Sequence, residues 1–179
     1  VVDHLLQAVA GWMRDFALDG LRLDVAYLLD RQFLSALARW CRQRKPDFWL
    51  LGEVIHGNYT RFIGPDLLDS VTNYECYKGL YSSLNDRNYF EIAYALTRQF
   101  GEAEGEERAG LYGGLPLYNF ADNHDVDRVA SRLRNPAHLT PLYCLLFTMP
   151  GVPSLYYGSG WGLTGRRTAS SDRALRPSL

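Results

Sequence analysis

The chain has 179 residues, of which 47% are hydrophobic and 22% are charged, and its formal net charge at pH 7 is −1. This composition is typical of a soluble domain with a buried core, and it offers no basic excess for a nucleic-acid backbone. The longest apolar run, residues 142–149, ends at Pro150 and falls short of the ~18 residues that a membrane helix requires. We therefore expect neither nucleic acid nor a membrane as partner, and the oligomeric state stays open.

The cysteines and the start of the chain indicate its context. Cys41, Cys76 and Cys144 are odd in number and share no metal-type spacing, so we expect small core residues rather than disulfides. No targeting segment is visible, and the chain begins at Val1 without an initiator Met. A chain without its original N-terminus would also lack its targeting segment, so this absence does not indicate the location. A cytoplasmic location is favoured, and we expect the chain to be a piece of a longer protein.

The first third of the chain alternates between helical and strand patterns. Apolar residues recur at helical spacing over residues 3–18, and residues 20–25 alternate in the manner of a short strand. A second helix is predicted over residues 33–41, closed by basic residues and Pro46. Residues 48–54 form an apolar run that suits a buried strand.

The alternation continues through the rest of the chain. A helix is expected to begin near Asn88, whose side chain could form a capping box with Glu91. We also expect strands at 68–74, 115–121 and 152–157, a helix at 136–149 and a surface loop at 101–114. Five strands that alternate with helices are typical of an α/β protein with parallel strands.

Two architectures of this class compete. A doubly wound sheet usually carries a Gly-rich phosphate loop after its first strand, and no such loop occurs; residues 158–162 lack the spacing. A TIM (β/α)8 barrel places its functional residues at the carboxyl ends of several strands. Asp24, Glu53 and residues 122–125 each lie at or just after such an end. The barrel is therefore favoured.

Two carboxylates follow the first two predicted strands. Arg22 and Asp24 are two residues apart and so share a face of the strand, which alone would fit a structural ion pair. Glu53 ends an apolar strand, which alone would fit a cap or loop contact. Together, two carboxyls at one barrel mouth can act as nucleophile and general acid, as in glycoside hydrolysis; a separation of about 5–5.5 Å would predict retention. Arg22 would keep the Asp24 carboxylate ionised and oriented.

A third polar cluster occupies residues 122–127. It fails as a calcium loop because Arg128 stands where glycine is needed, and it lacks a second His or Cys for zinc. His124 could donate to a sugar oxygen, and Asp125 could stabilise an oxocarbenium-like transition state. The alternative is a polar loop that is bonded to itself.

These motifs resemble a known family. Residues 20–26 (Gly-Leu-Arg-Leu-Asp-Val-Ala), 52–54 (Gly-Glu-Val) and 123–125 (Asn-His-Asp) resemble, in order and spacing, three of the four signature regions of the α-amylase superfamily, glycoside hydrolase family 13. Residues 70–74 and 150–158 resemble its sixth and eighth strands. The resemblance covers nearly the whole chain.

The resemblance implies specific roles for the polar residues. Asp24 would be the nucleophile, Glu53 the general acid/base and Asp125 the stabiliser of the transition state, with Arg22 and His124 as substrate-binding residues. The implied activity is the hydrolysis of α-glucosidic bonds in starch-derived oligosaccharides by a retaining double displacement, so an α-glucan or malto-oligosaccharide is the expected partner.

The resemblance also implies a fold, with departures. Residues 1–179 would form one incomplete catalytic barrel, approximately strands four to eight, without the N-terminal strands and their Asp…Asn-His signature. Five strands of eight cannot close a barrel, so we expect little or no activity from this segment alone. Tyr27 and Leu28 replace a Lys-His pair that many starch-degrading α-amylases carry, which favours neopullulanases, cyclomaltodextrinases and oligosaccharide glucosidases. Gly160 replaces a usual acidic residue.

Several alternatives stay open. A transglycosylase would use the same residues, whereas a non-catalytic homologue would be free to lose the carboxylates. A metal-dependent hydrolase on a similar barrel is a further alternative, which a metal assay would test. The motifs require no cofactor; calcium, which many relatives bind, stays possible. Flat faces for sugar rings could come from aromatic side chains, although any single one is expected in the core: Tyr59, Tyr74, Tyr77, Tyr118 and Trp161.

Overall fold

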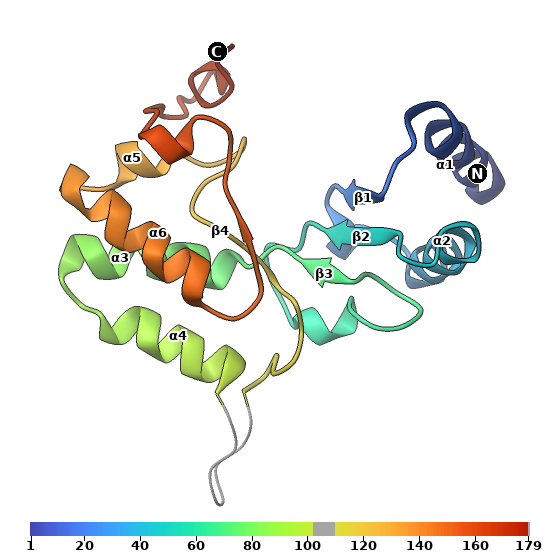
Figure 1. The fold of residues 1–179 in the computed structure, drawn as a ribbon, viewed down its shortest axis with the longest axis horizontal. Helices are drawn as coiled ribbons and strands as arrows, with labels where there is room; N and C mark the ends of the chain where they lie inside the picture. Colours follow the sequence, from blue (N-terminus) through green and yellow to red (C-terminus); the bar gives the residue numbers. More distant parts are fainter. Residues whose placement is uncertain (102–109, 179) are drawn as a thin grey trace, which may run out of the picture. The chain divides into compact units, whose positions relative to one another are not determined.

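The computed structural model describes residues 1–101 and 110–178, and the chain divides into two compact units (Figure 1). The first unit comprises residues Val1–Thr72 and the second Asn73–Leu179. Each unit has its own parallel sheet and its own helices. The predicted α/β class with parallel strands is therefore confirmed for the described residues.

The first unit is built on a three-stranded parallel sheet. Its strands β1 (Gly20–Leu23), β2 (Trp49–Gly52) and β3 (Ser70–Val71) are paired in that order. Leu23 lies opposite Gly52, so the residues that follow them, Asp24 and Glu53, leave neighbouring strands at the same edge. The strand register alone thus brings the first two predicted site residues together.

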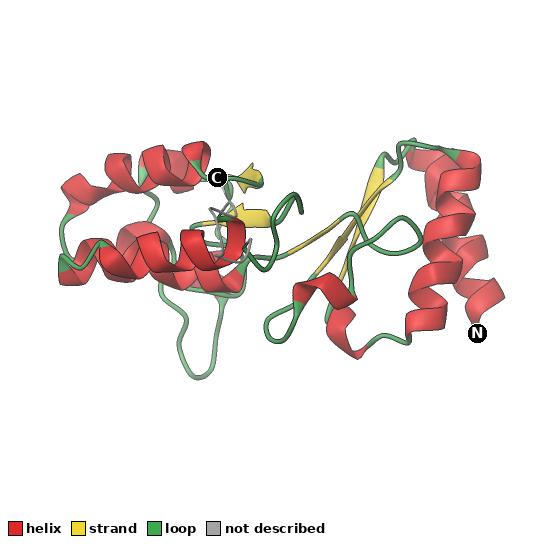
Figure 2. Cartoon of the chain, turned by 90° about the horizontal axis from the view of Figure 1, so that it is seen from below, coloured by secondary structure: helices red, strands yellow, loops and turns green. Residues whose placement is uncertain are grey.

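Two helices cover one side of this sheet (Figure 2). They are α1 (Val2–Phe16) and α2 (Arg31–Arg44), which confirms both predicted helices. Helix α2 begins where it does because Asp30 Oδ1 accepts hydrogen bonds from the backbone N–H groups of Gln32 and Phe33, at 2.8 and 3.0 Å. Its apolar face is fully buried and supplies much of this unit's core: Leu34, Leu37, Ala38 and Cys41.

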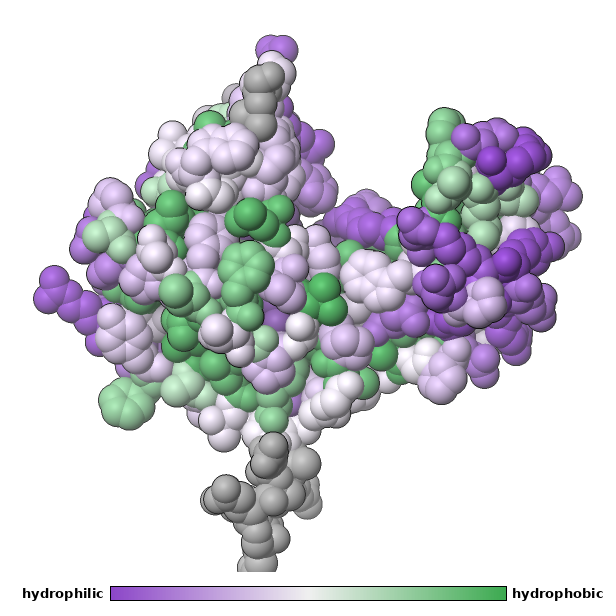
Figure 3. Space-filling view, viewed as in Figure 1, coloured by the Kyte–Doolittle hydropathy of each residue, from purple (hydrophilic) through white to green (hydrophobic). Residues whose placement is uncertain are grey.

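Helix α1 keeps part of its apolar face in solvent. Leu5, Trp12 and Phe16 recur at helical spacing and are all exposed, whereas Val9 is buried. The space-filling view shows green apolar atoms over this helix (Figure 3). The helix is therefore more apolar than its contacts within the described residues require.

The second unit packs three longer helices around an apolar core. They are α3 (Tyr74–Asp86), α4 (Phe90–Phe100) and α6 (Leu139–Thr148), with the short α5 (Val129–Arg132) beside them (Figure 1). The two strands β4 (Tyr118–Phe120) and β5 (Val152–Ser154) pair in parallel, Tyr118 opposite Val152. The core includes one buried cluster from these elements: Cys76, Leu80, Leu84, Ile92, Ala95, Ala121, Val129, Leu133, Leu142, Leu146 and Met149.

The strands are shorter than predicted, and one helix was not predicted. The strand expected at 68–74 is reduced to Ser70–Val71, because Asn73 starts helix α3: its Oδ1 accepts from the N–H of Cys76 at 3.2 Å. The polar amide, rather than the apolar pattern, decides where this strand stops.

The predicted capping box at Asn88 is wrong. Helix α4 begins at Phe90 with Tyr89 at the N-cap, and no side chain caps it. The Glu91 carboxylate pairs with the ammonium group of Lys78 on α3 instead. A charge on the neighbouring helix therefore outcompetes the local cap. The loop predicted at 101–114 lies partly outside the described residues; residues 111–114 form a turn.

The cysteines follow the prediction in two of three cases. Cys41 and Cys76 are buried, but Cys144 is exposed. It lies two residues from both Leu142 and Leu146, which are buried, so it faces the opposite side of α6. In the described part of the chain, no helix is long and apolar enough to cross a membrane.

Candidate active site

Arg22 connects the two carboxylates that follow β1 and β2. Its Nη1 donates to Asp24 Oδ1, and its Nη2 lies 3.1 Å from Glu53 Oε1. The predicted pairing of Arg22 with Asp24 is therefore present, and the guanidinium also reaches Glu53. One planar cation thus orients both carboxylates of the first unit.

The two carboxylates differ in their surroundings. The Asp24 side chain is 71% exposed, whereas that of Glu53 is only 7% exposed. Glu53 is also held by its backbone, whose N–H donates to the carbonyl of Leu23 at 2.9 Å. An accessible carboxylate beside a buried one is the asymmetry that a nucleophile and an acid/base require.

Gly52 allows β2 to approach its neighbours closely before Glu53. A Cβ at this position would lie 2.3 Å from Leu68 Cδ1 and 2.9 Å from Ala26 Cβ. Any larger residue would push the strand away from the loop after β1. The glycine of the Gly-Glu motif is thus explained by packing around the carboxylates.

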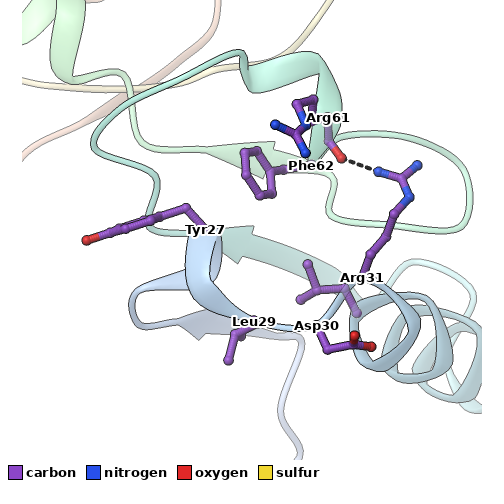
Figure 4. A pocket seen from close by; sticks show the side chains of 7 residues that line it. Tyr27, Leu29, Asp30, Arg31, Arg61 and Phe62 are labelled. Atoms are coloured by element: carbon purple, nitrogen blue, oxygen red, sulfur yellow. Dashed lines mark hydrogen bonds between the residues drawn. The ribbon is translucent and has the colours of Figure 1, made fainter.

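A pocket of about 350 Å³ opens between the segments that follow β1 and β2 (Figure 4). Two aromatic rings, Tyr27 and Phe62, contribute to its wall, and the Arg31 guanidinium donates to the carbonyl of Arg61 across it. Asp30, Leu29 and Leu34 complete the lining. The wall combines flat apolar faces with hydrogen-bond donors. Arg22, Asp24 and Glu53 do not line it, so this pocket is separate from the carboxylate pair.

The second unit positions the Asn-His-Asp motif directly after β4. Asn123 Oδ1 accepts from the N–H groups of Asp125 and Val126, at 2.8 and 3.1 Å, which turns the chain sharply. His124 Nε2 lies 3.0 Å from Asp125 Oδ2, and both side chains are about one-third exposed. The pair expected from the sequence is thus formed, and both residues remain accessible.

A buried network lies beneath this motif. Asp122 is almost fully buried; its Oδ2 accepts from the N–H of Val129 at 2.8 Å and lies 2.8 Å from the Ser159 hydroxyl. Burial raises the pKa of Asp122 above its usual range, although the Val129 and Ser159 hydrogen bonds act in the opposite direction. Arg128, which is fully buried, donates to the same Ser159 hydroxyl at 3.0 Å. A linked acid, hydroxyl and guanidinium therefore support the loop.

Two arginines support this site although the sequence pattern does not single them out. Arg128 stands where a calcium loop needs glycine, and it donates to the carbonyl of Leu175 at 2.7 Å. The second arginine is Arg176, the residue after Leu175, and its Nη2 lies 3.4 Å from Asp125 Oδ1. A pattern of charges along the chain could not reveal these contacts, because the partners are about fifty residues apart in the sequence.

The five aromatic side chains that could contact sugar rings differ in their exposure. Tyr59 and Tyr77 are buried, and Tyr77 stacks on Phe120 with ring centroids 5.1 Å apart. Tyr118 is partly buried, and its hydroxyl hydrogen-bonds to that of Ser154 at 2.5 Å. Tyr74 is partly buried and meets Phe120 edge-on at 4.9 Å. Trp161, which is 70% exposed, offers the most open face of the five.

Metal ligands are not assembled in the described residues. Across residues 1–101 and 110–178, no group of three or more His, Cys, Asp or Glu side chains could hold an ion.

Comparison with known proteins identifies relatives. The family model for the alpha amylase catalytic domain matches residues 1–177. A cyclomaltodextrinase from a Bacillus species is 32% identical over 168 residues, and the maltogenic alpha-amylase of Bacillus acidopullulyticus is 31% identical over 169 residues. Each alignment covers 92% of this chain but only 29% and 28% of those relatives.

A solved structure of a related enzyme matches the fold of this chain. The ligand-free cyclic alpha-maltosyl-(1→6)-maltose hydrolase from Arthrobacter globiformis aligns with a TM-score of 0.78 and 25% identity. The alignment covers 98% of this chain and 39% of that structure. The chain thus spans less than two fifths of each of these three proteins, and its fold is that of part of a TIM-barrel catalytic domain.

Proposed function

Because the chain belongs to the alpha-amylase catalytic domain family, we propose that it carries the main catalytic residues of an enzyme that hydrolyses α-glucosidic bonds in starch-derived oligosaccharides with retention. The observation that carries this proposal is the shared guanidinium of Arg22, which contacts both Asp24 and Glu53. A purely structural ion pair would not need a second, buried carboxylate beside an exposed one.

The proposed chemistry takes two steps. In the first, the Asp24 carboxylate attacks the anomeric carbon while the bond to the leaving oxygen breaks, and Glu53 gives its proton to that oxygen. In the second, Glu53 takes a proton from water, and the water oxygen displaces Asp24 from the anomeric carbon. Two inversions leave the configuration unchanged.

The remaining site residues bind and stabilise the sugar in this proposal. Asp125 opposes the positive charge that develops on the ring, and His124 donates to a sugar hydroxyl. Their accessibility and their 3.0 Å contact support these roles. Arg22 holds the two reacting carboxylates in place, beyond the substrate binding predicted from the resemblance.

We further propose that β1 to β5 are the fourth to eighth strands of the barrel and that residues 1–179 form an incomplete catalytic domain. The uncovered apolar face of α1 supports this, because the helices of a TIM barrel pack against neighbours on both sides. For the substrate class we propose a malto-oligosaccharide, and the names of two relatives, a cyclomaltodextrinase and a maltogenic alpha-amylase, support this. A cytoplasmic location stays a prediction.

The test uses the complete barrel that contains this chain. A fluorinated α-glucosyl fluoride should leave a covalent sugar on the peptide that carries Asp24, as detected by mass spectrometry. The Asp24→Asn variant should not be labelled, whereas Asp15→Asn, in an exposed ion pair, should be labelled normally. Labelling of another residue, or turnover without any labelled intermediate, would refute the assigned mechanism.

A further inference from the structure

Val25, directly after Asp24, has an unusual backbone conformation. Its φ and ψ are 47° and 40°, in the left-handed region that β-branched residues rarely adopt. Among the described non-glycine residues, Ala17 and Arg87 share a positive φ. Both of these end α-helices, where the left-handed conformation is common. Val25 instead precedes a single 3-10 turn, Ala26–Leu28, so helix termination does not explain it.

The backbone N–H of Val25 donates to Glu53 Oε2 at 3.0 Å. The other carboxyl oxygen, Oε1, lies 3.1 Å from Nη2 of Arg22. Contacts to both oxygens restrain rotation of the carboxyl group, which is also almost fully buried. The residue next to the proposed nucleophile thus reaches the proposed acid/base through its main chain.

The left-handed turn accounts for the direction of this N–H. The segment after Val25 is fixed, because Ala26 is fully buried and the N–H of Leu28 donates to the Val25 carbonyl at 2.9 Å. The φ angle of Val25 therefore sets the tilt of the Asp24–Val25 peptide plane. A right-handed Val25 would swing the plane, and its N–H, away from Glu53.

We infer that the strained backbone of Val25 is a positioning element for Glu53. The turn directs one amide N–H at the acid/base, and it couples the placement of Glu53 to that of Asp24 through a shared peptide. Strain of this kind persists only where the surroundings enforce it, and it concentrates at functional sites. The inference rests on the proposed function and goes beyond it, because it assigns the main chain a part in acid catalysis.

The sharpest test replaces the Val25 amide by an ester in the complete barrel, with 2-hydroxy-3-methylbutanoic acid at this position. The ester keeps the side chain and removes the N–H; it also makes the Asp24 carbonyl a weaker hydrogen-bond acceptor. A mispositioned acid slows the departure of a poor leaving group far more than that of an activated one. We expect kcat/KM for maltotriose to fall about tenfold to a hundredfold, the range for a hydrogen bond to a charged group, and that for α-maltosyl fluoride to fall less than about threefold.

The Val25→Gly variant is the matched control, because it keeps the N–H and adopts a positive φ without strain. Its kcat/KM for maltotriose divided by its kcat/KM for α-maltosyl fluoride should equal that ratio in the unaltered enzyme. A lower ratio in Val25→Gly would overturn the inference. A folded ester variant that loses the same activity on both substrates, or none on either, would overturn it too. If the ester variant does not fold, the Val25→Gly ratio decides alone. An unaltered enzyme that cleaves neither substrate would instead refute the proposed function.

Discussion

Replacing Arg128 by methionine should destabilise the second unit strongly. The guanidinium is fully buried, and it donates to the carbonyls of Tyr157 and Leu175 and to the Ser159 hydroxyl. It also lies over the ring of Tyr156, 4.1 Å from the centroid. Methionine fills a similar volume, so the change removes the charge and the donors rather than opening a large cavity.

The magnitude follows from opposing contributions. Hydrogen bonds from a charged donor contribute about 1.5–3 kcal/mol each, and a buried cation on an aromatic ring contributes about 2 kcal/mol. Burial of the cation itself costs several kcal/mol, which the substitution recovers. The two carbonyls and the Asp122–Ser159 pair, however, lose their donor inside the unit. The difference between these contributions is a loss of about 3–5 kcal/mol.

Urea unfolding, followed by circular dichroism, measures this loss. Arg134→Met is the matched control: Arg134 is exposed and pairs with Asp86 at 2.8 Å, and its loss should cost less than about 1 kcal/mol. Amide hydrogen exchange should also accelerate in residues 157–175, which Arg128 ties to the loop after β4. A loss below about 1 kcal/mol for Arg128→Met would refute the reasoning.

Three further predictions concern the carboxylates and the thiols. Asp24→Asn in the complete barrel should lower turnover of maltotriose at least about 10³-fold at unchanged stability, whereas near-normal turnover would contradict its role as nucleophile. Because burial raises the pKa of Asp122, the folded chain binds a proton there more tightly than the unfolded chain does. The free energy of unfolding therefore falls as the pH rises from the ordinary pKa of an aspartic acid to the raised pKa of Asp122. The Asp122→Asn variant should show a smaller decrease in the free energy of unfolding over this pH range. A pH profile equal to that of the unaltered chain would contradict the assignment to Asp122. Ellman's reagent at pH 8 should modify Cys144 rapidly and Cys41 and Cys76 only after denaturation, since burial raises the pKa of these two thiols to about 11 and about 12. Rapid modification of more than one thiol would show that the buried positions are wrong.

The sequence by itself determined the order of the strands and the position of the main polar residues. Alternating patterns and short apolar runs predicted all five strands, because successive side chains of a strand point to opposite faces of the sheet and a strand buried on both faces is apolar throughout. The strand-end location of Asp24 and Glu53 followed from the same pattern. Helix α3 escaped prediction because a single amide, Asn73, ends the preceding strand and starts the helix.

Only the tertiary structure decided how these residues are supported. Arg22 contacts Glu53, which is 31 positions away, and Arg128 is buried against a carbonyl 47 residues further along the chain. The left-handed turn at Val25 is likewise invisible in a sequence, since valine disfavours it and only its surroundings enforce it. A buried charge or a strained backbone is stable only through partners that folding brings together, and local patterns carry no information about those partners.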